Sequence, residues 1–211
     1  MSDAKLAEDF CSYGRSLFER GLTFGSTGNL SVRSSDGWLM TPTGVALNRL
    51  DPAQLSRLDA NGQPMTGPQP TKEAFLHLAM YAERSSASAI VHLHSTHSVA
   101  VSCLADVDHD NVLPPVTAYY VMRIGTLPMV PYFPPGDVAL AEAVRAKAGR
   151  HHAVLLANHG PVVAGTALSA AVDAIEELEE AAKLYLMLRH EKTRWLTEEA
   201  ANHLRRRYQP N

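Results

Sequence analysis

PTKEAFLHLAMYAERSSASAIVHLHSTH, residues 70–97, holds the helix and the strand around which the rest of this chain is organised. Its first half predicts a helix from Thr71 to about Arg84, since Pro70 precedes it and Thr71 is a favourable N-cap residue. The apolar residues at helical spacing are Phe75, Leu78, Ala79 and Ala82. The second half, Ala89 to His94, is a short apolar run typical of a buried strand.

Two histidines close this predicted strand. Side chains alternate between the faces of a strand, so His92 and His94 share one side while Val91 and Leu93 point the other way. Their Cα atoms would lie roughly 6.5–7 Å apart, which allows both imidazoles to bind one ion. The alternative is that they are two polar residues near a strand end, and Ile90 on the same face shows that this face is not uniformly polar.

Three further residues of the stretch are candidates for the same site. Glu73 lies in the first turn of the predicted helix, where a carboxylate either compensates the helix dipole or takes part in chemistry. His77 follows four residues later on the same helix face. We expect it either to contact the side chains that bind the ion, without binding the ion itself, or to have a purely structural role. His97 extends the pattern to HxHxxH, although a short helix expected over 95–104 would turn it away.

Two short polar loops precede this stretch. Residues 25–29 read GSTGN and residues 41–44 read TPTG, with strand-like segments at 30–33 and 38–41. Loops of glycine, serine, threonine and asparagine can offer N–H and hydroxyl donors to an anion such as phosphate. Neither contains the GxxxxGK[ST] pattern of a P-loop, and each taken alone is also compatible with an ordinary turn.

The segment TAYYVMR, residues 117–123, holds another group of reactive side chains. The phenol of Tyr119 or Tyr120 could donate a proton, and the Arg123 guanidinium could bind a carboxylate through two hydrogen bonds. Packing of these aromatic residues at a contact between subunits is the alternative.

The composition narrows the class of protein. The chain has 211 residues and a formal charge of −3, which fits one globular domain and gives no sign of a nucleic-acid-binding surface. No apolar run approaches about 18 residues, so no membrane span is expected. The N-terminal residues lack the pattern of a signal peptide, and Cys11 and Cys103 are expected to be buried free thiols. Together these features favour a cytoplasmic protein.

A second histidine-bearing strand end lies near the C-terminal third. Residues 153–157 predict a buried strand ending in NHG, and PVVAG returns as its antiparallel partner. With His159 there, three imidazoles and the Glu73 carboxylate would suit a tetrahedral Zn²⁺ site whose carboxylate a substrate can displace. Spacing along the chain does not show that His159 lies near His92 and His94.

The ordered set of motifs resembles the class II aldolase/adducin family over nearly the whole chain. The motifs are STGNLSVR (26–33), TPTG (41–44), PTKE (70–73), VHLH (91–94) and ANHG (157–160). The resemblance implies an α/β fold of three layers, α/β/α, with a mostly antiparallel central sheet, formed by residues 1–211 as a single domain. It also implies a homotetramer with active sites between subunits.

The resemblance implies roles for individual residues. His92, His94, His159 and Glu73 would bind Zn²⁺, or another divalent metal such as Mn²⁺ or Co²⁺, and Glu73 would also be the acid/base. The residues implied at the phosphate are Asn29, Thr43, Gly44 and Thr71, with Ser26 or Thr27 contributing and Lys72 beside them.

Within the family, the chain is more similar to the decarboxylases of 3-oxo-tetronate 4-phosphate. The features are residues 14–33, 113–125 and 131–137, together with Lys72, where the fuculose-type aldolases carry a small hydroxyl residue. The epimerases of the family carry aspartate in place of Glu73. This resemblance implies a metal-dependent carbon–carbon lyase that releases CO₂ and dihydroxyacetone phosphate through a metal-stabilised enediolate.

Other activities remain open from the sequence. The main alternative is a class II aldolase that cleaves a ketose or sugar-acid phosphate to dihydroxyacetone phosphate and an aldehyde. A dehydratase acting on a thio-sugar phosphate is a minor option. An adducin-like binding module without metal is disfavoured, because such a module would be expected to lack the histidines or the glutamate that this chain carries.

Overall fold

A computed structural model describes residues 2–134 and 136–208, and within them the strands form one eight-stranded sheet. The strand order is β4-β3-β2-β1-β5-β8-β7-β6, and only the β6–β7 pair is parallel. The strands are β1 Asn29–Arg33, β2 Gly37–Met40, β3 Ser56–Asp59, β4 Pro64–Thr66, β5 Ala89–His92, β6 Met129–Val130, β7 Ala153–Leu156 and β8 Gly160–Gly165. The expectation of a mostly antiparallel sheet is confirmed.

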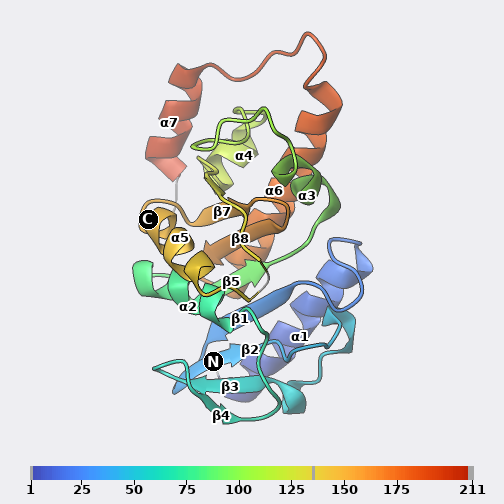
Figure 1. Cartoon of the computed structure of the whole chain (residues 1–211), viewed down its shortest axis with the longest axis vertical. Helices are drawn as coiled ribbons and strands as arrows, with labels where there is room; N and C mark the ends of the chain where they lie inside the picture. The colour runs from blue at the N-terminus through green and yellow to red at the C-terminus, as the bar shows by residue number, and fades with distance from the viewer. Residues whose placement is uncertain (1, 135, 209–211) are drawn as a thin grey trace.

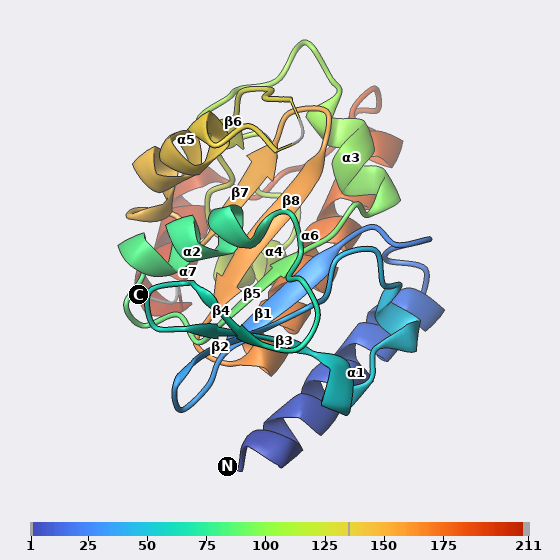
Figure 2. The same cartoon turned by 60° about the horizontal axis from the view of Figure 1, so that its bottom comes forward.

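Helices cover both faces of this sheet, which gives the expected three-layer α/β/α arrangement (Figures 1 and 2). α2 and α5 pack on one face, and α1, α3, α4, α6 and α7 contribute to the core on the other. The helices are α1 Asp3–Glu19, α2 Ala74–Glu83, α3 Thr96–Ser102, α4 Ala118–Arg123, α5 Ala139–Ala148, α6 Leu168–Leu188 and α7 Glu198–Tyr208. Two short 3₁₀ turns, Leu47–Arg49 and Pro52–Gln54, follow β2.

The two cores are separated by side-chain alternation along the strands. In β5, Ile90 packs into the core beneath α2 and α5, whereas Val91 packs into the opposite core together with Leu93, which follows the strand. All three are fully buried, as is His92. The predicted alternation is therefore confirmed, and it directs the His92 imidazole to the face that carries α2.

The helix that follows Pro70 begins later than predicted. It starts at Ala74, because residues 70–72 first run beside the TPTG loop through the Pro42–Pro70 bridge and the Thr71 N–H to Thr41 carbonyl bond of 2.9 Å. The Thr71 hydroxyl accepts a hydrogen bond from the Glu73 N–H. Of the four apolar residues at helical spacing, Ala79 is buried, Phe75 and Leu78 pack partly buried against the core, and Ala82 is exposed. The other buried residues of α2 are Leu76, His77, Met80 and Tyr81.

The cysteine prediction holds for one residue only. Cys11 is buried in α1, but Cys103 is exposed, since α3 ends at Ser102 and Cys103 lies just beyond it. Both thiols are free. Within residues 2–134 and 136–208, no helix combines the length and the apolar character needed to cross a membrane.

Candidate metal centre

The hairpin between β7 and β8 carries His159 to the centre of the sheet. A three-residue loop, 157–159, joins the strands, with Asn158 in the left-handed conformation at φ 55° and the His159 N–H bonded to the Leu156 carbonyl. β8 also pairs with β5, and Val162 lies opposite His92. His159, remote in sequence, thus reaches the end of the strand that bears His92.

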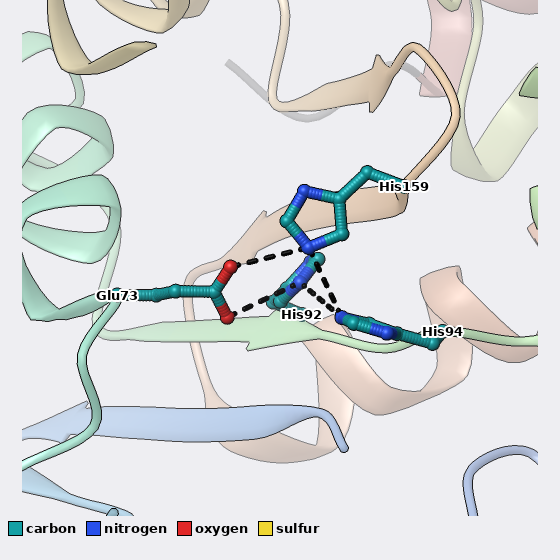
Figure 3. Close-up of side chains that lie close together, drawn as sticks. All are labelled: Glu73, His92, His94 and His159. Atoms are coloured by element: carbon teal, nitrogen blue, oxygen red, sulfur yellow. Dashed lines mark hydrogen bonds and ion pairs between the residues drawn. The ribbon is translucent and has the colours of Figure 1, made fainter. Parts of the chain in front are cut away.

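The three imidazoles and one carboxylate converge on a single point (Figure 3). The Nε2 atom of His94 lies 3.1 Å from the Nε2 atoms of both His92 and His159. Glu73 closes the group from the start of α2, with Oε2 3.4 Å from His92 Nε2 and Oε1 3.2 Å from His159 Nε2. A tetrahedral ion with bonds of about 2.0–2.1 Å has ligand atoms about 3.3–3.4 Å apart, so this spacing fits a metal.

The tautomer of His92 supports the same interpretation. Its Nδ1 atom lies 2.8 Å from the Pro161 carbonyl oxygen, which can only accept a hydrogen bond, so Nδ1 carries the proton. Neutral His92 then turns the lone pair of Nε2 toward a carboxylate oxygen of Glu73, and two acceptors face each other. A cation between them removes this conflict, and a carbonyl partner behind a ligand histidine is the arrangement usual at metal centres.

The protonation states favour metal ligands as well. Burial lowers the pKa of His94 to about 3 and also lowers the pKa of His92, which keeps both imidazoles neutral at pH 7. Burial works to raise the pKa of the Glu73 carboxyl, but hydrogen bonds from His159 and Asn29 act against it, and the pKa lies below its ordinary value. Neutral imidazoles and an ionised carboxylate are the forms that bind a divalent cation.

A cavity of about 790 Å³ opens in front of this cluster. Both polar loops and the segment before α2 line it, so residues expected at a phosphate and residues expected at a metal share one space. The phosphate candidates on its wall are Ser26, Thr27, Asn29, Thr43, Gly44, Thr71 and Lys72. Glu73, His94 and His159 line the same cavity, and His92 lies buried behind them.

The wall of the cavity distinguishes between some of these candidates. The Thr27 hydroxyl lies 2.6 Å from the Phe24 carbonyl and donates to it, whereas Ser26 is exposed, which favours Ser26 as the free hydroxyl donor. Lys72 is exposed and supplies the only ammonium or guanidinium group among the described residues that line the cavity.

Other candidates lie elsewhere in the chain. Tyr119 and Arg123 both line two other cavities. The Arg123 guanidinium also forms an ion pair with Asp173 at 2.9 Å. The side chain of Tyr120 is buried. Within one chain none of them lines the cavity of the cluster, so their role stays a prediction that depends on a second subunit. His97 is turned away as expected, and its Nδ1 atom lies 2.8 Å from Glu179.

Several wall residues were not singled out from the sequence. Tyr132 and Phe133 line the cavity from the segment between β6 and α5, and Tyr132 is largely exposed. An aromatic pair placed between prolines in an irregular segment is the signal that could have indicated them. Thr96 and Asn158 also line the cavity. They lie within two residues of the predicted ligands His94 and His159, so no separate sequence signal indicates them.

The chain matches the Class II Aldolase and Adducin N-terminal domain over residues 8–186. It belongs to the class II aldolase and adducin family. A 3-oxo-tetronate 4-phosphate decarboxylase of Haemophilus influenzae is 47% identical over 208 residues, covering 98% of this chain and 99% of the relative. The L-fuculose phosphate aldolase of Escherichia coli is 34% identical and covers 88% of this chain and 85% of its own length.

A solved structure, described as a putative aldolase/epimerase/decarboxylase, has the same fold. YgbL from Klebsiella pneumoniae superposes with a TM-score of 0.95 at 44% identity, covering 97% of this chain and 100% of that one. The family assignment inferred from the motifs is therefore confirmed. The decarboxylase is the more similar of the two named relatives in both identity and coverage.

Proposed function

We propose that this protein is a metal-dependent carbon–carbon lyase that decarboxylates a 3-oxo-tetronate 4-phosphate to dihydroxyacetone phosphate and CO₂. The observation that carries the proposal is the convergence of three Nε2 atoms and one carboxylate at 3.1–3.4 Å on the wall of a cavity that also holds the phosphate candidates. The 47% identity to a decarboxylase of that substrate over almost its full length supports the substrate.

The proposed substrate is a β-keto acid, with a carboxylate at C1, a hydroxyl at C2, a ketone at C3 and a phosphate at C4. Breaking the C1–C2 bond releases CO₂ and leaves its electron pair at C2, from which it delocalises into the C3 carbonyl. Addition of one proton at C2 then gives dihydroxyacetone phosphate. Stabilising the negative charge on the substrate oxygens is thus the main task of the site.

His92, His94 and His159 would hold the divalent cation, with Glu73 as a ligand that the substrate displaces. We propose Zn²⁺, with Mn²⁺ or Co²⁺ as alternatives, because neutral imidazoles suit all three ions. Bound there, the ion supplies Lewis-acid stabilisation of the charge that develops on the substrate oxygens.

Glu73 is the proposed acid/base. Its carboxylate is ionised, lies at the edge of the cavity and is hydrogen-bonded to Asn29 at 2.7 Å. An ionised carboxylate can accept the proton of the C2 hydroxyl, and in its protonated form it can return a proton to C2.

The two polar loops would bind the phosphate. Ser26 and Thr43 offer hydroxyl groups and Gly44 offers an N–H on the wall of the cavity. Asn29 and Thr71 also line it, and both are hydrogen-bonded to Glu73. Lys72 would position the carboxylate of the substrate, or the phosphate, by charge. A tight ion pair to the carboxylate would stabilise the ground state and slow the loss of CO₂, so we assign Lys72 to positioning.

We further propose that residues 1–211 act as a single domain within a cytoplasmic homotetramer whose active sites lie between subunits. The two hydrophobic cores flank one continuous sheet, which supports a single domain. In such a tetramer Tyr119, Tyr120 or Arg123 of a neighbouring copy would reach the cavity. Neither a nucleic acid nor a membrane is a proposed partner.

Incubation of the zinc-loaded protein with a 3-oxo-tetronate 4-phosphate tests this function. Release of CO₂ in equal amount to dihydroxyacetone phosphate supports a decarboxylase, and an aldehyde as co-product supports an aldolase instead. His94→Ala and removal of the metal by a chelator should each abolish the release. Full CO₂ release without metal would overturn the proposed role of the cluster.

A further inference from the structure

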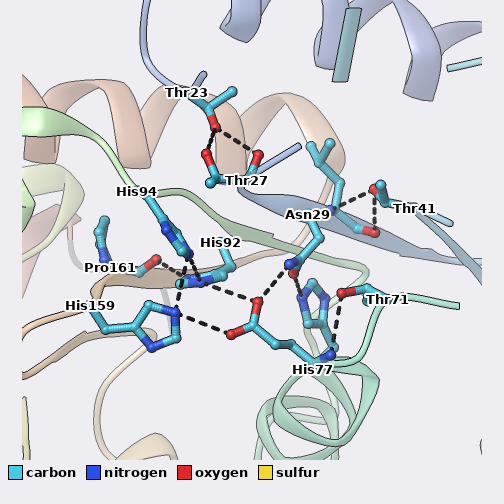
Figure 4. A network of polar contacts seen from close by, with 12 residues as sticks. Thr23, Thr27, Asn29, Thr41, Thr71, His77, His92, His94, His159 and Pro161 are labelled. Atoms are coloured by element: carbon cyan, nitrogen blue, oxygen red, sulfur yellow. Dashed lines mark hydrogen bonds and ion pairs between the residues drawn. The ribbon is translucent and has the colours of Figure 1, made fainter. Parts of the chain in front are cut away.

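A chain of four hydrogen bonds runs from the core beneath α2 to the carboxylate of Glu73. The Tyr81 hydroxyl lies 2.9 Å from Ser31 Oγ, and Ser31 Oγ lies 2.7 Å from His77 Nδ1. His77 Nε2 lies 2.6 Å from Asn29 Oδ1, and Asn29 Nδ2 donates to Glu73 Oε2 at 2.7 Å. Figure 4 shows Asn29 directly beside the His77 ring.

In each hydrogen bond of this chain, the chemistry of the two groups determines which one donates and which one accepts. Asn29 turns its amide N–H toward the carboxylate, so its carbonyl oxygen faces His77 and accepts a hydrogen bond from the Nε2–H. Burial lowers the pKa of His77 to about 3, so the ring is neutral and Nδ1 accepts. The Ser31 hydroxyl therefore donates to His77, and the Tyr81 hydroxyl donates to Ser31.

A reversed chain would leave acceptors facing each other. If the Asn29 amide were flipped, its carbonyl oxygen would meet the Glu73 carboxylate, which has no proton to give. The carboxylate thus determines which end of the amide faces it, and His77 holds the opposite end of the same amide at 2.6 Å.

The environment makes each bond of the chain necessary. Ser31 and His77 are fully buried and Tyr81 is 4% exposed, so a donor or acceptor left without a partner at these three residues is costly. Asn29 is 5% exposed and lies where the chain reaches the wall of the cavity. Tyr81 is itself fixed, since its ring stacks on Trp38 with centroids 4.0 Å apart. The chain thus connects β1 and α2 to the ligand cluster through rigid elements.

We infer that His77 is a positioning residue that orients the Asn29 amide and thereby holds the Glu73 carboxylate against the metal position. This inference rests on the proposed function, since it needs the cluster to bind a metal. Residues that orient a metal ligand typically affect metal affinity or activity by about 10- to 100-fold when they are lost.

Two substitutions at position 77 separate orientation from packing. His77→Leu fills the space without a donor, whereas His77→Gln restores an N–H that can reach Asn29. His152→Leu is the matched control, because His152 is also buried and also hydrogen-bonded, but to the Arg123 carbonyl outside the cavity. Zn²⁺ affinity is measured by competition with a chromophoric chelator, and kcat and KM are measured on the loaded proteins.

The inference predicts that His77→Leu weakens Zn²⁺ binding by about 10- to 100-fold and that His77→Gln recovers most of it. His152→Leu should keep the wild-type affinity even if it is less stable. In a Glu73→Ala background, His77→Leu should have no further effect on affinity, because no carboxylate remains to be oriented. An equal loss in both backgrounds, or no loss in His77→Leu, would overturn the inference.

The tautomer gives a readout that needs no metal. In ¹⁵N-histidine-labelled protein, long-range ¹H–¹⁵N correlation should show His77 neutral with its proton on Nε2. A proton on Nδ1 would reverse the chain and overturn the inference while leaving the proposed function intact. A wild-type protein that binds no divalent ion would overturn both.

Discussion

Gly160 lies so close to the backbone of Leu93 that a Cβ added at Gly160 would overlap the Leu93 carbonyl oxygen and approach the His94 Cα to 3.5 Å. Its φ of 155° is also one that other residues rarely adopt. This close approach joins the start of β8 to the end of β5. It is the reason that His159, one residue before Gly160, reaches the imidazoles of His92 and His94.

Gly160→Ala should therefore move His159 away from the other two ligands. We expect loss of bound Zn²⁺ and a fall in kcat of about 100-fold, the size expected for an ångström-scale misplacement. Metal content by plasma emission spectroscopy and the rate of CO₂ release measure the two effects.

Gly21→Ala is the control for the backbone effect alone. Gly21 also has a positive φ, 74°, but an added Cβ would meet nothing within 4 Å. This variant should lose about 1 to 3 kcal/mol of stability and keep its metal. If Gly160→Ala behaves in the same way, the close approach to Leu93 does not position His159.

Glu73→Gln should separate metal binding from proton transfer. The amide keeps the shape of the side chain and an oxygen ligand, so metal content should stay near one ion per chain, but turnover should fall by about 10²- to 10⁴-fold. Glu83→Gln at the other end of the same helix is the control, since Glu83 pairs with Arg145 away from the cluster. Turnover at the wild-type rate in Glu73→Gln would remove Glu73 from the chemistry.

Lys72→Ser should discriminate between substrates. Loss of this charged contact should lower kcat/KM for the carboxylated substrate by about 10- to 100-fold. The kcat/KM for an aldol substrate without that carboxylate should change little. Steady-state kinetics with both substrates give the comparison, and Lys183→Ser on α6 serves as a remote control. An equal loss for both substrates would mean that Lys72 contacts only the phosphate.

The stability of the protein should fall in mild acid because of a histidine outside the site. Burial lowers the pKa of His152 from its ordinary value near 6.5 to about 4, so the unfolded chain binds a proton there before the folded chain does. The stabilising contribution of neutral His152 to the free energy of unfolding is fully present above pH 6.5. It is lost as the pH falls toward 4, by at most about 1.4 kcal/mol per pH unit. Urea unfolding with chelator present should show a shallower pH dependence for His152→Gln, and identical slopes would contradict the assignment.

The sequence indicated the parts of the site that depend on one strand or one loop. The period of two along residues 89–94 predicted which way His92 points, and the polar loops predicted the wall of the cavity. The convergence of His159 with His92 depends on strand pairing and on the close approach of Gly160 to Leu93, which no local pattern reports. The family resemblance supplied the ligand set that joins His159 to His92.

The errors concern where helices begin and end. Residues 70–72 pair with the TPTG loop, so the helix begins at Ala74 although Thr71 is a favourable N-cap. Cys103 was expected inside a helix, but α3 ends one residue earlier and exposes it. The orienting role inferred for His77 needs the β1–α2 contacts, which spacing alone does not give.

The most direct measurement is X-ray diffraction at the zinc absorption edge from crystals of the zinc-loaded protein. The account predicts one anomalous peak about 2.0–2.1 Å from the Nε2 atoms of His92, His94 and His159. The absence of a peak among these atoms, or a His159 imidazole directed away from the other two in every subunit, would contradict it.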